Sequence, residues 1–386
     1  MKKSRLALLI SSLLALPPLS SCGTYDLVVF NWGEYADMDV IRKFEKKYGV
    51  KVNYLTFDSN ENLLSKLDTT HFDICFPSDY AIEELAVKEK IKPIDYSRLS
   101  NFNFETDLVD GLKVSLDKLK ADSLGKEGFD LLKYSIPYTY GVIGILYNKN
   151  IISKEELDKY GWNTLKNPYN EDGSKRKVVM YDSARDVFSV ALLACDKDIV
   201  EVKDEDIKLA TSWLIDQKKT IGNNLAYKTE EILDDMPNEK YDICFSYIGD
   251  AIYSMYVSYE ENGDNQFDFY IPESKDSKTR TNVYVDAMCL SSNVKNEDLA
   301  YKFLDFMQEY ENAYDNAIYN GYPSPLKRIT DDITSDSSEY EDGEPGSYNF
   351  IKDTYQVETD ERDAFYRYDQ DLKTALEEAW IEVKIS

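Results

Sequence analysis

The stretch "DLVVFNWGEYADMDVIRKFEKKYGVKVNYLTF" at residues 26–57 carries the pattern that predicts the fold. It begins with "DLVVFN" at residues 26–31, which we read as a strand because Val28, Val29 and Phe30 form the apolar run typical of a buried strand. Residues 38–49 place apolar side chains at helical spacing and end at Gly49, which predicts an amphipathic helix. A second strand is expected at residues 50–57. A strand, a helix and a strand in succession favour a mainly parallel sheet with helices on its faces.

The same alternation continues along the chain and predicts an α/β fold. Strands are expected at residues 72–78, 177–181 and 241–247, and each is followed by a helical pattern. Residues 102–133 are charged and weakly patterned, so we interpret them as a surface insertion. In parallel sheets, ligands bind beyond the carboxyl ends of the strands, so the loops after these strands are the first place to look for a site.

Two further β stretches are expected to cross between two lobes that have a ligand cleft between them. They are Pro137–Gly144, with glycines inside a strand pattern, and Tyr284–Cys289, where the chain returns. The expected division is a signal peptide at residues 1–21, lobe 1 at 22–136 and 288–312, and lobe 2 at 137–287 and 313–386. Each lobe is thus discontinuous in sequence.

The charge balance restricts the possible partners. The 386 residues include 45 Lys and Arg against 72 Asp and Glu, a formal net charge of −27. Such an excess repels nucleic acid and anionic membrane surfaces and attracts cations over long distances. We therefore expect no nucleic-acid partner. Solubility alone would also explain the charge, so the balance by itself does not identify a ligand.

The N-terminus has the features of an export signal. Lys2, Lys3 and Arg5 precede an apolar stretch at residues 6–16, which is too short to span a membrane. It is followed by "LSSC", which resembles the lipobox of bacterial lipoproteins and ends at Cys22. This resemblance implies acylation of Cys22 and an extracytoplasmic protein anchored to the cell membrane. The alternative is an ordinary secretory signal with a chance cysteine.

Residue usage argues against the common catalytic and metal centres. The chain contains one histidine, His71, so Ser-His-Asp, Cys-His and multi-His arrangements are disfavoured. The four cysteines after Cys22 show no CxxC spacing, and each lies in an apolar run. We expect no metal, no cofactor and no enzymatic activity. A two-carboxylate glycoside hydrolase stays open as an alternative, because acidic and aromatic clefts also bind sugars.

Several strand-end loops combine aromatic and acidic side chains. They are Trp32–Tyr35, Tyr181–Asp186, Tyr247–Asp250, Tyr284–Asp286 and the loop with Tyr322. An alkyl diammonium ion would require this mixture, because each ammonium group has three donors and no acceptor. Carboxylates supply charge-assisted hydrogen bonds of about 1.5–3 kcal/mol each. Ring faces add apolar walls and a cation–π attraction of about 0.5–2 kcal/mol.

At these loops the sequence resembles the bacterial polyamine-binding proteins, the spermidine/putrescine receptors of ABC importers. The resemblance rests on "NWGEY", "FDICFPSDYAIEEL", "SIPYTYGVIGILYN", "GWNTLKNP", "DSARDVF", "YIGD" and "GYPSP", and it covers most of the chain. It implies a periplasmic-binding-protein-like fold of type II. It also implies a protein that captures putrescine or spermidine by hinge closure and delivers it to permease subunits. A receptor of the same fold for another organic cation, such as thiamine, is the second alternative.

The resemblance also implies which residues bind the ligand. The implied positions are Trp32, Glu34, Tyr35, Ser78, Tyr80, Asp186, Thr229, Tyr247, Asp250, Tyr284, Asp286 and Tyr322. The aromatic residues would wall the cleft, and Asp250 and Asp286 would share a terminal amine. Asp186 would take an amine from the other lobe, Glu34 would lie beside an ammonium group, and Thr229 would offer a hydroxyl.

The polyamine itself is left open by two departures from the family pattern. Ser183 stands where spermidine-type members carry an acid, and the neighbouring Asp182 is a candidate substitute or a helix N-cap. Asp250 instead matches the putrescine-type pattern. Arg185 is expected to form an ion pair that orients Asp186 rather than to contact the ligand.

Overall fold

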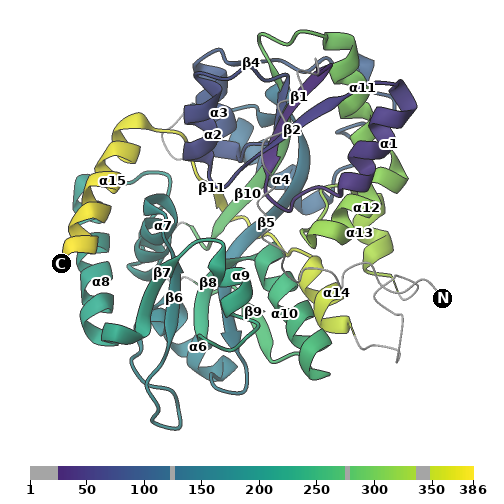
Figure 1. The fold of residues 1–386 in the computed structure, drawn as a ribbon. Helices are drawn as coiled ribbons and strands as arrows, with labels where there is room; N and C mark the ends of the chain where they lie inside the picture. The colour runs from purple at the N-terminus through teal and green to yellow at the C-terminus, as the bar shows by residue number, and fades with distance from the viewer. Residues whose placement is uncertain (1–24, 122–126, 274–278, 336–347) are drawn as a thin grey trace, which may run out of the picture.

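The computed structural model describes residues 25–121, 127–273, 279–335 and 348–386. The expected signal peptide and Cys22 lie outside these ranges. The described residues form two α/β halves, one above the other in Figure 1, which meet at two long strands. The expected α/β architecture is therefore confirmed. Among the described residues, no helix combines the length and the apolar character that crossing a bilayer requires.

The first half, at the top of Figure 1, is built mainly from the N-terminal part of the chain. Its elements are β1 (Leu27–Trp32), α1 (Met38–Tyr48), β2 (Val52–Phe57), α2 (Asn60–Leu67), β3 (Ile74–Cys75), α3 (Asp79–Val87), β4 (Ile91–Lys92), α4 (Asp110–Lys120) and α5 (Leu131–Tyr134). Strand β1 pairs in parallel with both β2 and β3, as the opening stretch predicts. Their carboxyl ends therefore reach the same edge of the sheet.

The local sequence explains why this half begins as it does. The side chain of Asp37 accepts a hydrogen bond from the backbone N–H of Asp39, which caps the start of α1. The helix ends at Gly49, whose φ of 66° is a left-handed conformation that glycine adopts without steric cost. Val40, Ile41 and Phe44 are buried on the inner face. These signals fix the length of α1 and thus where the chain enters β2.

The second half, at the bottom of Figure 1, repeats the arrangement with a second parallel group of strands. Its elements are α6 (Lys154–Tyr160), β6 (Val178–Tyr181), α7 (Ala184–Ala194), α8 (Asp204–Ile221), β7 (Leu225–Lys228), α9 (Glu231–Asp235), β8 (Ile243–Tyr247), α10 (Ile248–Asn262) and β9 (Phe267–Tyr270). Strand β6 pairs in parallel with β7 and β8. The loops after β6 and β8 thus leave the sheet at a common edge.

Two antiparallel strands connect the halves, and all of their residues are buried. They are β5 (Ser135–Asn148) and β10 (Asn282–Ser291). Strand β5 pairs with β10 over its first part and with β8 and β9 over its last part. Strand β10 continues to β3, so the sheet runs from β2 through β10 and β5 to β7. Both predicted crossings, Pro137–Gly144 and Tyr284–Cys289, lie within these strands.

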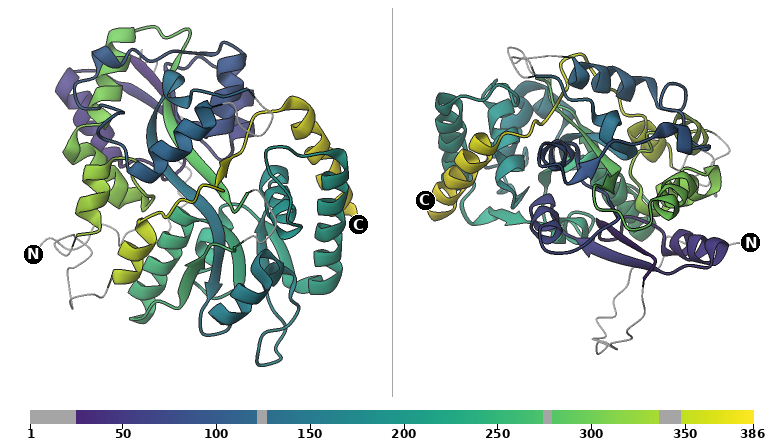
Figure 2. Two further views of the ribbon diagram at one scale, coloured as in Figure 1. Left: turned by 180° about the vertical axis from the view of Figure 1, so that it is seen from behind. Right: turned by 90° about the horizontal axis from the view of Figure 1, so that it is seen from above.

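The C-terminal part of the chain visits both halves. Its elements are α11 (Glu297–Met307), α12 (Tyr310–Asn320), α13 (Lys327–Ile333), α14 (Asn349–Tyr355), β11 (Ala364–Phe365) and α15 (Gln370–Ile385). Helix α12 contacts α1 and α11, whereas α14 contacts α10 and α15 contacts α7 and α8 (Figure 2). The two-lobe division stays a proposal. Because α12 packs on the first half, we place the end of lobe 1 at the end of α13 rather than at residue 312.

The expected surface insertion at residues 102–133 is instead a packed part of the first half. It contains α4 and α5, and α4 buries Leu112, Leu116 and Leu119. These leucines repeat at helical spacing on one face, while Lys and Asp fill the other faces. Because the exposed faces are charged, the helical spacing of these leucines was not recognised in the sequence.

Candidate functional site

Asp286 lies in the middle of the crossing strand β10, where it is only 6% exposed. Its carboxylate accepts hydrogen bonds from the Ser78 hydroxyl at 2.6 Å and the Tyr35 hydroxyl at 2.5 Å. Thr139 on β5 is the residue opposite, and its hydroxyl lies 2.5 Å from that of Tyr35. Tyr35 follows β1, and Ser78 precedes α3. The strand ends of the first half thus converge on one carboxylate of the crossing strand.

Asp250 is the corresponding carboxylate of the second half. It lies in the first turn of α10, directly after β8, and is 9% exposed. One carboxylate oxygen accepts a hydrogen bond from the Tyr181 hydroxyl at the end of β6. The other accepts from the Tyr322 hydroxyl, which belongs to the loop between α12 and α13. Both donors are neutral hydroxyl groups, so neither compensates the charge.

Six aromatic rings form a continuous row that links the two halves, and we call this row the ring chain. The ring centres are 6.4 Å apart for Trp32 and Tyr35, 5.1 Å for Tyr35 and Tyr322, 6.4 Å for Tyr322 and Tyr284, 5.1 Å for Tyr284 and Tyr247, and 5.6 Å for Tyr247 and Tyr181. Most of these pairs meet edge to face, a favourable aromatic geometry. Both carboxylates bond to members of this chain.

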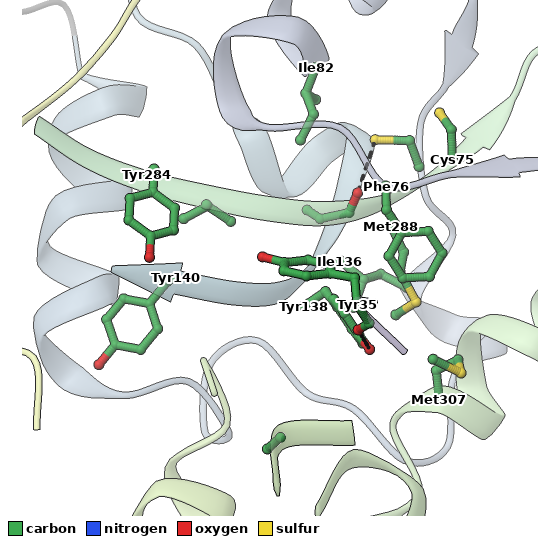
Figure 3. Close-up of a cluster of buried hydrophobic side chains, with 14 of the residues drawn as sticks. Tyr35, Cys75, Phe76, Ile82, Ile136, Tyr138, Tyr140, Tyr284, Met288 and Met307 are labelled. Atoms are coloured by element: carbon green, nitrogen blue, oxygen red, sulfur yellow. Dashed lines mark hydrogen bonds between the residues drawn. The ribbon is translucent and has the colours of Figure 1, made fainter. Parts of the chain in front are cut away.

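Figure 3 shows two members of the ring chain, Tyr35 and Tyr284, beside the crossing strands. Tyr284 projects from β10, and Tyr35 lies with Tyr138 near the same pair of strands. The rings of Tyr35 and Tyr138 are 5.8 Å apart, and the Tyr138 hydroxyl donates to the backbone carbonyl of Tyr35 at 2.9 Å. Phe76 packs edge-on against Tyr138 at 5.0 Å. Tyr138 on β5 therefore anchors the loop after β1 to the crossing strands.

The site concentrates negative charge in a buried place. Burial raises the pKa of Asp250, and the nearby charge of Asp286 raises it further. Burial likewise raises the pKa of Asp286, against the opposing effect of hydrogen bonds from Ser78 and Tyr35. Asp79 is a third buried acid, and burial raises its pKa to about 7. An upward shift means that the ionised form is disfavoured, so a cation placed between these carboxylates would be strongly stabilised.

Asp79 fixes the backbone beside Tyr80 and the Tyr284–Asp286 segment of β10. Its carboxylate accepts hydrogen bonds from the backbone N–H of Tyr80 at 2.7 Å and of Val285 at 2.9 Å. Val285 stands between Tyr284 and Asp286 on β10. The contact therefore ties the start of α3 to the crossing strand at the position that carries both residues.

Arg185 in α7 supplies a positive charge at one end of the site. Its guanidinium is 2.7 Å from the Asp186 carboxylate, as the sequence predicts, and it donates to the Tyr247 hydroxyl at 2.9 Å. It also covers the ring of Tyr80, 4.3 Å from the centroid. The Tyr80 hydroxyl donates to Glu61 at 3.0 Å. Asp186 and Tyr80 thus face an internal cation.

The structure does not bring two of the predicted residues to the buried carboxylates. Glu34 is exposed and accepts a hydrogen bond from the Tyr319 hydroxyl at 2.6 Å. Thr229 is exposed after β7, and its hydroxyl bonds only to Glu231, at 3.4 Å, within the described part of the chain. The remaining ten predicted positions are Trp32, Tyr35, Ser78, Tyr80, Asp186, Tyr247, Asp250, Tyr284, Asp286 and Tyr322, and they form one connected region.

The neighbours of Asp186 have structural partners. Asp182 accepts hydrogen bonds from Trp380 at 3.0 Å and Lys384 at 2.8 Å, both in α15. Ser183, not Asp182, caps α7 by accepting from the backbone N–H of Asp186. The interpretation of Asp182 as an N-cap is therefore wrong, and in this structure its carboxylate bonds to α15.

The list of implied binding positions left out three members of the site, although Tyr181 had been named in one of the aromatic and acidic loops. Tyr181 and Thr139 bond to the two central residues or their donors, and Asp79 anchors β10. Tyr181 and Asp79 directly follow or adjoin strand ends that the sequence already marks, so their position was a usable signal. Thr139 is visible only once the pairing of β5 with β10 is known. No group of three or more potential metal-ligating side chains occurs in the described ranges.

Comparisons with known proteins agree with this architecture. The family profile "Bacterial extracellular solute-binding protein" matches residues 39–342. The spermidine/putrescine-binding periplasmic protein of Salmonella typhimurium is 26% identical over 355 residues, covering 90% of this chain and 91% of the relative. The putrescine-binding periplasmic protein PotF of Escherichia coli is 27% identical over 288 residues, covering 73% of this chain and 72% of the relative.

Solved structures confirm the periplasmic-binding-protein fold. A putative spermidine/putrescine ABC transporter protein from Listeria monocytogenes superposes with a TM-score of 0.67 at 27% identity, covering 93% of this chain and 98% of that one. The TpPotD lipoprotein of Treponema pallidum gives 0.68 at 20% identity over 93% and 99%, which shows a shared fold. The matched family consists of binding proteins, so the glycoside hydrolase alternative is set aside. The chain belongs to the bacterial extracellular solute-binding proteins.

Proposed function

We propose that this protein binds a polyamine, putrescine or spermidine, between its two halves and delivers it to the permease of an ABC importer. The observation that carries the proposal is the pair of buried carboxylates, Asp250 and Asp286, whose hydrogen-bond donors are neutral hydroxyls. The ring chain that lies against them offers the apolar and π surfaces that a methylene chain with charged ends requires. The names of the relatives point to the same ligands.

The energetics favour a cation with more than one charge. Each ammonium–carboxylate hydrogen bond contributes about 1.5–3 kcal/mol, and each well-placed ring face adds about 0.5–2 kcal/mol. A ligand with a single charged centre leaves the second buried carboxylate without a charged partner, which costs about 1–3 kcal/mol. Thiamine carries one fixed positive charge, so it matches two carboxylates less well than a diamine does.

The mechanism follows from the origin of the site residues. Trp32, Tyr35 and Ser78 come from the first half, whereas Tyr181 and Asp250 come from the second. A ligand that contacts both sets stabilises the arrangement in which the halves are close together. Binding therefore shifts the population toward the closed form, which is the form that docks on the permease. No bond is made or broken.

The attachment to the cell is part of the proposal. We assign the attachment to a lipid on Cys22 after removal of residues 1–21. Cys22 lies outside the described residues, so the support is the "LSSC" sequence and the lipoprotein relative from Treponema pallidum. The stretch between Cys22 and β1 is short, which would keep the protein near its permease.

Isothermal titration calorimetry of the purified protein without residues 1–22 tests the ligand class. The panel is putrescine, spermidine, thiamine and an oligosaccharide. We expect micromolar or tighter binding of a polyamine, which corresponds to a binding free energy of about −8 kcal/mol or more favourable. We expect no comparable binding of thiamine or of the oligosaccharide. Binding of thiamine in preference to both polyamines would contradict the proposal.

A further inference from the structure

Cys75 and Cys289 face each other on neighbouring strands. Cys75 ends β3, and Cys289 lies on the crossing strand β10, where the two residues are direct partners in the antiparallel ladder. Both are fully buried and reduced in the structure, and Figure 3 shows Cys75 beside the crossing strands. Burial raises the pKa of the Cys289 thiol, and the hydrogen bond and charge of Cys75 raise it further. The two thiol groups therefore lie within reach of each other.

The ladder places the two α-carbons at a distance that a disulfide can span. The backbone N–H groups of Ala287 and Ser291 donate to the carbonyls of Pro77 at 3.1 Å and Asp73 at 2.9 Å. Because every second pair of an antiparallel ladder is hydrogen-bonded, the cysteine pair between them is of this type, with a Cα separation of about 5.5 Å. Disulfides join α-carbons about 4.4–6.8 Å apart. The β-carbons must approach to about 3.5–4.5 Å, so the bond would carry some strain and be easier to reduce than a relaxed one.

The other described cysteines have no such partner. Cys244 on β8 lies opposite Leu146 and Val179, and Cys195 follows the end of α7. Neither has a cysteine opposite it. The pairing of cysteines is therefore particular to the point where the first half joins the crossing strand.

The ladder that carries the cysteines also carries part of the candidate site. Ser78 and Asp286 are direct partners three residues further along the two strands, and the Ser78 hydroxyl donates to the Asp286 carboxylate at 2.6 Å. A covalent bond between Cys75 and Cys289 would fix the register that brings Ser78 to Asp286.

We propose that Cys75 and Cys289 form a reversible disulfide that locks β3 of the first half to the crossing strand β10. The chain belongs to a family of extracellular proteins, and disulfides form and persist in the oxidising surroundings outside the cytoplasm. The inference does not depend on which ligand the protein binds.

The bond forms by thiol–disulfide exchange with a small disulfide oxidant such as oxidised glutathione. The thiolate of one cysteine attacks the oxidant, forms a mixed disulfide and releases one glutathione thiolate. The thiolate of the second cysteine then attacks the sulfur of the first, which closes the bond and releases the second glutathione. The two protons and two electrons of the cysteine thiols thus end on two glutathione thiols. Because both cysteines are buried in the folded chain, the exchange takes place before β10 docks on β3.

Oxidative refolding followed by peptide mapping tests the bond. The chain from residue 23 onward contains every described residue and four cysteines. It is unfolded with a thiol reductant and refolded in a buffer of reduced and oxidised glutathione, and the remaining thiols are blocked with N-ethylmaleimide in acidic denaturant. We expect the refolded protein to have lost the mass of two hydrogen atoms and to yield one linked peptide pair that contains Cys75 and Cys289. Cys195 and Cys244 should both be blocked.

The bond should also raise the melting temperature. It closes a loop of about 200 residues and so restricts the unfolded chain. We expect the oxidised protein to melt about 3 °C or more above the same protein after reduction. Heating scans with and without a thiol reductant measure this shift.

Three alanine variants serve as controls. Cys75→Ala and Cys289→Ala each remove one partner, so the linked peptide and the melting difference should both disappear. Cys244→Ala is the matched control, because Cys244 is also a fully buried strand residue but lies opposite Leu146. Its linked peptide and its melting difference should match those of the wild type.

Three results would overturn the inference. The first is four free thiols in the refolded wild type, and the second is a disulfide that involves Cys195 or Cys244 instead. A linked Cys75–Cys289 pair with no rise in melting temperature overturns the locking role. If an alanine variant does not fold, the peptide map of the wild type still decides, since it identifies the paired cysteines directly. None of these results bears on ligand binding, so the proposed function stands or falls separately.

Discussion

At the scale of single residues, the site is defined by how Asp286 and Asp250 are solvated. Both carboxylates have lost water and have gained hydroxyl donors, Ser78 and Tyr35 for the first and Tyr181 and Tyr322 for the second. Hydroxyl groups orient a carboxylate but leave its charge unbalanced, so part of the desolvation cost remains. A bound ammonium group would offset that cost. Neither acid has an ion-pair partner in the described residues, although the charge of Arg185 acts on Asp286 from a distance and lowers its pKa.

Removing one of these charges should weaken ligand binding sharply. Asp286→Asn and Asp250→Asn each replace a charged acceptor by a neutral amide of nearly the same shape. We expect each to lower putrescine affinity by about 10- to 100-fold, which corresponds to about 1.4–2.8 kcal/mol. Titration calorimetry with putrescine measures the change.

The matched control is Asp182→Asn. This acid lies close in sequence to Asp186 but bonds to Trp380 and Lys384. Its replacement should leave putrescine affinity within about twofold of the wild type, because it removes no site carboxylate. Normal binding by Asp286→Asn and Asp250→Asn would show that the site is assigned to the wrong residues.

Ligand binding should also depend on pH and release protons. Burial raises the pKa of Asp250 and Asp286 above the ordinary carboxyl value of 3.8, so the free folded protein keeps these protons to higher pH than an unfolded chain does. The free protein therefore loses stability as the pH rises through the folded-state pKa of these two acids. A bound ammonium group, by contrast, favours the ionised form of both carboxylates. Putrescine affinity should therefore fall as the pH is lowered through the pKa of these two acids.

Calorimetry at mildly acidic pH in two buffers with different ionisation enthalpies measures this proton linkage. The observed heat should differ between the buffers in the direction that corresponds to proton release by the protein. Proton uptake on binding would contradict the assignment, since it would require acids that become more protonated beside a cation.

Site residues were predictable from the sequence where a family motif marked them. They were less predictable where their position depends on contacts between distant parts of the fold. The motif positions Trp32, Tyr35 and Asp286 do meet in the structure. Glu34 is next to Tyr35 in sequence, yet its φ of 51° directs the chain so that its side chain reaches Tyr319. The double use of Arg185, which pairs with Asp186 and stacks on Tyr80, depends on contacts across the two halves that no local pattern encodes.

At the scale of elements, the glycine at the start of α10 controls how closely the loop after α12 can approach. A Cβ on Gly249 would lie 2.3 Å from the ring of Tyr322, which cannot be accommodated without moving that ring. Tyr322 donates to Asp250 and packs against Tyr35 and Tyr284. The absence of a side chain at residue 249 therefore lets the second half join the ring chain.

Gly249→Ala should accordingly weaken ligand binding, although residue 249 itself has no side chain that contacts the ligand. Displacement of Tyr322 removes a donor from Asp250, so we expect putrescine affinity to fall by about tenfold or more. The unfolding free energy should fall by about 1–3 kcal/mol, as is common for overpacking. Calorimetry and denaturant titration measure the two effects.

Gly33→Ala is the control for this substitution. A Cβ at Gly33 meets no atom within 4 Å, and Gly33 lies in the Trp32–Tyr35 loop. We expect its affinity to stay within about twofold of the wild type. Equal behaviour of the two alanine variants would show that the close approach at Gly249 has no functional role.

The elements themselves were largely predictable, because their caps and apolar spacing are local. The first strand, helix and second strand occur where the opening stretch predicts them, and the start of α7 at Ala184 is also correct. The strand expected at residues 72–78 shortens to Ile74–Cys75, since Pro77 lacks the N–H that a ladder requires. Helix α4 was missed because Lys and Asp outnumber the leucines that define its buried face.

At the scale of the whole molecule, the two crossing strands make the site a property of both halves. Strands β5 and β10 pair with each other in the middle of the sheet. From there β10 continues to β3 and β5 continues to β8, so these two strands join the halves. The net charge of −27 draws cationic ligands toward the molecule from a distance. The ring chain then places rings from both halves within reach of one small ligand.

Ligand should therefore stabilise the folded molecule as a unit. At a free putrescine concentration of about 100 times the dissociation constant, the unfolding free energy should rise by about 2.7 kcal/mol. Denaturant titration with and without ligand measures this increase, and Asp250→Asn at the same ligand concentration should show a smaller one. No stabilisation of the wild type at saturating ligand would be inconsistent with binding to the folded state.

The most direct test of the central claim is a crystal structure of the protein with putrescine. The account predicts density for one diamine against the ring chain, with its two nitrogens about 2.7–3.2 Å from carboxylate oxygens of Asp250 and Asp286. A ligand bound away from both Asp250 and Asp286 would contradict it.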